Sequence, residues 1–131
     1  MRSPALQIRW LRLILGAVAV ESGAILALFI VVAIFGPRDA AAAQAYAEKM
    51  GRWVGPLAGM VLCFFGGWIV ARKATGSELL HGLLFGTLTA LIDVALLIAM
   101  HAHFEPLFVV SDLAKVVAAS AGGVCAFARR R

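Results

Sequence analysis

Apolar residues fill four long stretches of the chain, and short polar segments separate these stretches. The stretches cover residues 13–35, 53–71, 79–100 and 106–128. Each has about the 20 residues that an α-helix needs to cross the ~30 Å hydrocarbon core of a bilayer. The pattern therefore predicts an all-α membrane protein with four transmembrane helices, and the short connections favour an antiparallel bundle. In this interpretation residues 1–131 form a single transmembrane domain.

The first connection has helix signals of its own. Asp39 suits an N-cap, the residues that follow it are good helix formers, and Gly51 is a residue type that commonly ends a helix. We therefore expect a short helix over about residues 39–50 that lies on the outer face of the membrane.

Lys and Arg residues are distributed unequally between the connections. Of the 12, eight lie at the two termini and in the second connection, three lie in the first connection, and one is inside the fourth stretch. The eight are Arg2, Arg9, Arg12, Arg72, Lys73, Arg129, Arg130 and Arg131, and the three are Arg38, Lys49 and Arg52. Because short cytoplasmic loops carry an excess of Lys and Arg, this distribution predicts that both termini are cytoplasmic.

The first apolar stretch imitates a secretory signal peptide, since basic residues precede it and the small residues 40–43 follow it. It is longer than the ~7–15 apolar residues of a signal peptide, and it contains Glu21. We expect it to be retained as a transmembrane helix.

The overall composition agrees with a lipid environment. Hydrophobic residues make up 63% of the chain, charged residues make up 15%, and the mean hydropathy is +0.95. A basic pI of about 10.0 can indicate nucleic-acid binding. Here the cations lie at the ends of apolar stretches and form no basic stripe, so we expect the lipid bilayer, and no nucleic acid, as a partner.

Small residues recur at helical spacing inside the apolar stretches, a pattern that permits close packing of transmembrane helices. The glycines concerned are Gly55, Gly59, Gly66, Gly82, Gly86 and Gly122, of which Gly82 and Gly86 have the GxxxG spacing. Two interpretations remain open: these faces pack within one chain, or some of them pack against another copy or a membrane partner protein.

Four ionisable residues lie within the apolar stretches, where they are energetically expensive and indicate function by default. They are Glu21, Asp93, Asp112 and Lys115. Asp112 and Lys115 are three residues apart and therefore share a helix face. A rise of about 1.5 Å per residue places Lys115 between Glu21 and the two aspartates in depth. The spacing predicts a buried cluster in which Lys115 is the shared cation.

This cluster has three interpretations. It is an ion-pair network that only fixes how the helices pack, its surplus of carboxylates binds a proton or a small cation, or its members are boundary residues whose side chains extend to water. The first interpretation predicts a small membrane protein that acts through helix–helix assembly, either with itself or as an accessory subunit. The second predicts a minimal proton- or cation-coupled transporter or channel.

Several kinds of chemistry have no sequence support. The chain lacks a Walker loop and the HExxH, GxSxG and CxxC motifs, so we expect neither an enzyme nor a cofactor. Cys63 and Cys125 lie in apolar stretches and suggest no metal site. His101, His103 and Glu105 alternate in the third connection, which we interpret as a polar interfacial loop and not as a metal site.

The second stretch ends in Ala71-Arg72 after a Gly-rich helix, and the third opens with His81-Gly82 and a second glycine at Gly86. This pattern resembles a family of small bacterial four-helix inner-membrane proteins with no assigned activity, over about two of the four helices. The resemblance implies a multi-pass protein of the bacterial inner membrane and carries over no catalytic residue. Small multidrug-resistance transporters also have four helices and a glutamate in the first, like Glu21, but their other signature residues are missing here.

The predicted orientation can be tested with reporter fusions. A fluorescent protein fused after Arg131 should fluoresce, because the charge distribution places the C-terminus in the cytoplasm. A phosphatase that is active only outside the cytoplasm should be active when fused after Arg38 and inactive when fused after Arg131. The reverse pattern would contradict the orientation.

Overall fold

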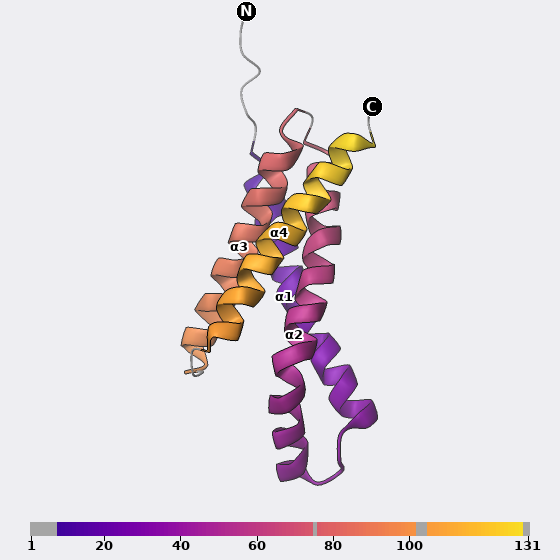
Figure 1. Ribbon diagram of the computed structural model, residues 1–131, viewed down its shortest axis with the longest axis vertical. Coiled ribbons are helices and arrows are strands. Elements are labelled where there is room, and N and C mark those ends of the chain that lie inside the picture. The colour runs from indigo at the N-terminus through magenta and orange to yellow at the C-terminus, as the bar shows by residue number, and fades with distance from the viewer. Residues whose placement is uncertain (1–7, 75, 102–104, 130–131) are drawn as a thin grey trace, which may run out of the picture.

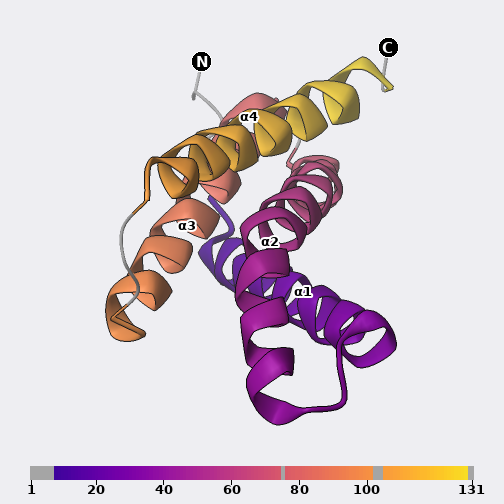
Figure 2. The ribbon, with the colours of Figure 1, turned by 60° about the horizontal axis from the view of Figure 1, so that its bottom comes forward.

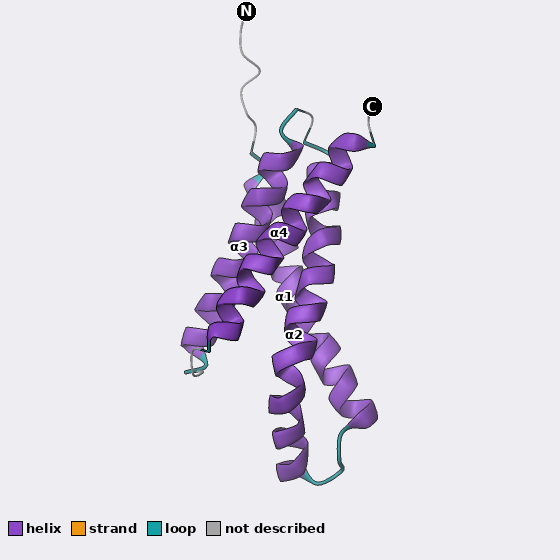
Figure 3. Cartoon of the chain, in the orientation of Figure 1, coloured by secondary structure: helices purple, strands orange, loops and turns teal. Residues whose placement is uncertain are grey.

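The computed structural model describes residues 8–74, 76–101 and 105–129. In this part of the chain all regular structure is helical (Figure 3). The four helices are α1 (Trp10–Phe35), α2 (Ala40–Ala71), α3 (Glu78–Ala99) and α4 (Pro106–Ala128). All four are long and apolar enough to cross a membrane, which confirms the four stretches predicted from the hydrophobic pattern.

Local sequence signals explain where the helices begin and end. The side chain of Asp39 accepts a hydrogen bond from the backbone N–H of Ala42 at 2.9 Å, as expected of an N-cap. Pro106 occupies the first turn of α4, where its missing N–H costs nothing. Gly76 has φ +84° in the connection before α3, a conformation that glycine adopts without strain.

The prediction of a separate short helix over residues 39–50 is wrong. α2 runs without interruption for 32 residues, so Gly51 does not end it, and Pro56 lies inside it. Gly51 does not adopt the positive φ with which a glycine commonly ends a helix. A helix of this length extends about 48 Å, which is longer than the ~30 Å hydrocarbon core. The residues predicted as a separate helix are therefore the first turns of the same long helix.

The most extensive contact between two helices is that of α2 with α4. α4 packs most extensively against α2 and α3, while α1 packs against α2 and, over a smaller area, against α3. α2 therefore separates α1 from α4 (Figure 2). Figure 1 shows that the pair α1–α2 and the pair α3–α4 spread apart toward the connection between α1 and α2.

Among the described residues, Phe85 of α3 is the largest fully buried side chain. Two glycines make room for its ring: an added Cβ would lie 2.8 Å from the ring at Gly16 and 2.7 Å from it at Gly66. Many large apolar side chains, such as those of Phe29 and Leu113, face outward instead. An outer surface of this kind fits lipid and does not fit water.

Glycines also allow backbones to approach closely at the interfaces of α4. An added Cβ at Gly122 would clash with the carbonyl oxygen of Phe64 in α2, and one at Gly86 would lie 2.7 Å from the Cα of Val116. Gly82 faces Ala119 in the same way. In contrast, an added Cβ at Gly55 would meet nothing within 4 Å. Most of these glycines therefore pack against other helices of the same chain.

These contacts predict opposite effects for two identical substitutions. Gly122→Ala should lower the free energy of unfolding by ~1–3 kcal/mol or more, because the new methyl group meets rigid backbone. Gly55→Ala should be neutral or stabilising by ~0.5–1 kcal/mol, because alanine favours the helix and the space is open. Unfolding in mixed detergent micelles measures both. Equal effects of the two substitutions would contradict the packing described here.

Candidate functional site

Lys115 lies on the inner face of α4 and is only 3% exposed. Its side chain passes the backbone of α2 at Gly59, where an added Cβ would lie 2.7 Å from the lysine Cε. The sequence predicts Gly59 as a helix-packing position. In the structure this glycine gives space to the lysine side chain, so that the ammonium group reaches the middle of the bundle.

The ammonium group of Lys115 contacts carboxylates from three helices. It donates a hydrogen bond to Oε1 of Glu21 in α1 at 3.1 Å and one to Oδ2 of Asp93 in α3 at 2.5 Å. Oδ1 of Asp112, one turn earlier on α4, lies 3.6 Å away. The structure thus brings together all four ionisable residues that the sequence places inside the apolar stretches. Lys115 is their shared cation.

Carboxyl groups outnumber ammonium groups in this cluster. Three carboxyl groups surround one ammonium group, and the buried Oδ1 of Asp112 has no hydrogen-bond partner among the described residues. An uncompensated charge in a low-dielectric interior is costly. The cluster therefore has the capacity to hold an additional proton.

The other buried polar groups nearby do not complete the charge balance. The hydroxyl of Thr89 donates to the backbone carbonyl of Phe85 at 2.9 Å, so it serves its own helix. Within the described part of the chain, no group of three or more metal-ligating side chains is placed to hold a metal ion. His101 is exposed at the end of α3, whereas His103 lies outside the described residues.

A cavity of about 140 Å³ adjoins the cluster. Glu21, Asp93 and Lys115 line its polar side, and Gly55 and Phe108 lie among the residues on its other walls. A water molecule needs only ~10–15 Å³ of such space together with polar partners, so the cavity has room for several waters. It is partly open and extends toward the end of the bundle where α1 joins α2. The side chain of Asp93 is the most exposed of the four, at 22%.

An ion pair lies near the same end of the bundle. Arg52 of α2 and Glu105, the residue before α4, approach to 3.1 Å at exposed positions. Sequence reasoning missed this pair, the cavity and the role of Gly59, because each depends on how two helices cross. The only signal of the pair in the sequence is that both charges lie next to an apolar stretch.

Comparison with known proteins found no matching family model, no similar protein among those with a curated function and no similar solved structure. The evidence about function therefore comes from the site itself.

Removing the lysine should lower the stability of the protein strongly, and neutralising the carboxyl groups as well should restore it. Lys115→Met should lower the free energy of unfolding by ~3–5 kcal/mol, because buried carboxylates lose their counter-ion. Lys49→Met removes an exposed lysine of α2 and should change stability by less than ~0.5 kcal/mol.

Neutralising the carboxyl groups tests the physical reason for this loss. Combining Lys115→Met with Glu21→Gln and Asp93→Asn should restore much of the lost stability, because no unpaired charge then remains at either position. Detergent unfolding of purified protein measures all of these variants. A triple variant no more stable than Lys115→Met would contradict the electrostatic explanation.

Proposed function

We propose that this chain is a multi-pass protein of the bacterial inner membrane that binds protons or small cations at the Lys115 cluster and passes them across the bilayer. The observation that carries the proposal is the cavity that reaches Glu21, Asp93 and Lys115. A network that only fixed helix packing would need neither a surplus of carboxylates nor a space for water beside it. In a membrane interior, such groups typically mark ion or proton pathways.

The proposed orientation is an antiparallel bundle with both termini in the cytoplasm. It is supported by the short connections and by the excess of Lys and Arg at the termini and between α2 and α3. In this orientation the cavity opens toward the outside, because its walls include residues from the second half of α1 and the first half of α2, which lead to the connection between these helices.

The geometry suggests how a cation would bind. Asp93 is the carboxylate most accessible from the cavity, and it holds the closest contact to the Lys115 ammonium. A proton or cation that arrives through the cavity competes with that ammonium for Asp93. The lysine keeps Glu21 as a partner when it releases Asp93, so it is never left without a counter-ion.

Passage to the cytoplasm requires a rearrangement of the packed core. Phe85 is fully buried and lies eight residues before Asp93 on α3, about 12 Å further toward the cytoplasmic side. We infer that the described arrangement is the outward-open one, with Phe85 as the barrier. Release inward would need the Phe85 ring to leave its place between Gly16 and Gly66.

A second candidate function is helix–helix assembly, with another copy or as an accessory subunit. It is favoured by the exposed side chains of Trp53 and Leu57, which are four residues apart and therefore lie on one outer face of α2. The mass of the purified protein in detergent separates the two proposals, because assembly through this face predicts a complex that Leu57→Ala disrupts.

Flux measurements test the transport proposal directly. Proteoliposomes containing the wild-type chain should dissipate an imposed proton or cation gradient faster than empty liposomes. Asp93→Asn should slow this flux about tenfold or more, since the first binding group is lost. Glu48→Gln removes an exposed carboxylate of α2 and should leave the flux unchanged. A wild-type flux equal to that of empty liposomes would contradict the proposal.

A further inference from the structure

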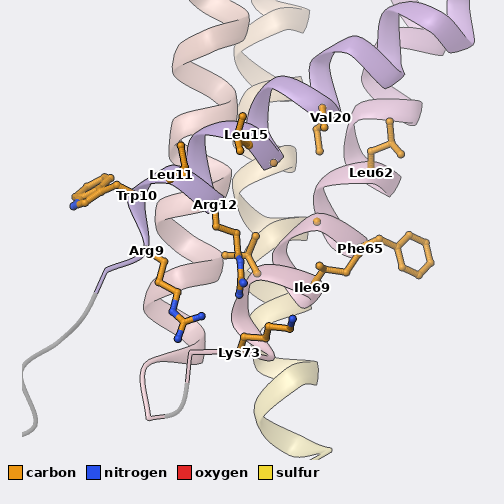
Figure 4. A pocket seen from close by; sticks show the side chains of 14 residues that line it. Arg9, Trp10, Leu11, Arg12, Leu15, Val20, Leu62, Phe65, Ile69 and Lys73 are labelled. Atoms are coloured by element: carbon orange, nitrogen blue, oxygen red, sulfur yellow. The ribbon is translucent and has the colours of Figure 1, made fainter.

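A second and larger hollow lies at the opposite end of α1 and α2 from the cavity. It is a groove of about 910 Å³ between the first half of α1 and the second half of α2, and no member of the Lys115 cluster lines it. Its walls are mainly apolar side chains, among them Leu15, Leu62 and Ile69 (Figure 4). This volume is at the upper end of the ~300–1,000 Å³ typical of small-molecule sites.

Three cationic side chains gather at one end of this groove. Figure 4 shows the nitrogen atoms of Arg9, Arg12 and Lys73 near one another, while Leu15, Val20 and Leu62 lie toward the other end. In the described part of the chain no carboxylate forms an ion pair with any of these three cations. The Nη1 atom of Arg12 is buried and has no hydrogen-bond partner there. A buried guanidinium nitrogen without a partner indicates a missing acceptor.

We propose that this groove binds an anionic phospholipid of the cytoplasmic leaflet, with the phosphate between Arg9, Arg12 and Lys73 and an acyl chain along the apolar walls. Basic pockets between transmembrane helices on the cytoplasmic side suit anionic lipid headgroups. The inference depends on the proposed orientation of the bundle. It does not depend on cation transport, so lipid binding and transport can each be disproved without the other.

The dimensions of the groove agree with this occupant. Arg12 and Val20 are eight residues apart on α1, which corresponds to about 12 Å along the helix axis. Half of a ~30 Å hydrocarbon core is about the same length. The groove therefore extends from the level of the headgroups into the hydrocarbon of a single leaflet, as one acyl chain does.

Charge argues against a second copy of the chain as the occupant. A symmetric dimer brings the same patch of both subunits together. Such a contact through this groove would place Arg9, Arg12 and Lys73 close to their own counterparts, and like charges in an interface are repulsive. An anionic lipid neutralises the same three cations.

Trp10 lines the groove and provides a local probe. In a chain carrying Trp53→Phe and Trp68→Phe it is the one remaining tryptophan, because the sequence has 3. We would reconstitute this chain in phosphatidylcholine nanodiscs that contain a small fraction of brominated phosphatidylglycerol or the same fraction of brominated phosphatidylcholine. Brominated phosphatidylglycerol should quench Trp10 fluorescence at an about tenfold lower fraction.

Matched variants separate the headgroup from the acyl chain. The combination Arg9→Gln, Arg12→Gln and Lys73→Gln should abolish the preference for phosphatidylglycerol. Arg38→Gln with Lys49→Gln removes exposed cations near the other end of the bundle and should preserve it. Ala19→Phe fills the groove without changing any charge and should reduce quenching by both lipids.

The same preparation also controls for misfolded variants and for other occupants of the groove. Arg12→Lys should retain the preference and Arg12→Gln should weaken it, which keeps the test valid if the triple variant does not fold. Equal quenching by the two lipids in the chain with wild-type cations would overturn the proposal. So would displacement of the lipid by excess inorganic phosphate, or a dimeric mass without lipid preference.

Discussion

The contact between the Lys115 ammonium and the carboxylates of Glu21, Asp93 and Asp112 constrains the rest of the structure. Charged side chains in a membrane interior are tolerable only when they meet one another or water. α4 carries both Asp112 and Lys115 and is the least hydropathic of the four helices. Its place in the bundle therefore depends on acceptors from α1 and α3. The contacts fix the rotation of all three helices and the depth at which they meet.

Glycines make this arrangement sterically possible. Gly59 lets the lysine pass α2, while Gly16 and Gly66 accommodate the Phe85 ring. The small residues thus draw the helices together at one end of the bundle, and the cavity beside the cluster lies where the two pairs diverge. Close packing on one side of the charges and open space on the other is the asymmetry that a protein with access from one side requires.

The four helices and the meeting of the four charges were predictable, because apolar length, helical periodicity and rise per residue determine them without tertiary information. The continuity of α2 through Gly51 could not be predicted, because glycine ends a helix only where the following chain turns away. The role of Gly59 was also hidden. Spacing alone marks it as a small residue, whereas its neighbour Lys115 comes from a helix more than fifty residues later. The cavity and the cationic groove likewise arise from how helices cross.

If the cluster takes part in transport, its buried carboxyl groups hold an exchangeable proton in contact with water. Infrared spectroscopy of the reconstituted protein tests it most directly, because a protonated carboxyl group has its own stretching band, and this band shifts when its proton exchanges for deuterium. We expect a band that changes with pH, exchanges promptly in deuterated buffer and is altered by Asp93→Asn. A cluster with no pH-dependent carboxyl band, or with a band that keeps its hydrogen in deuterated buffer, would contradict it.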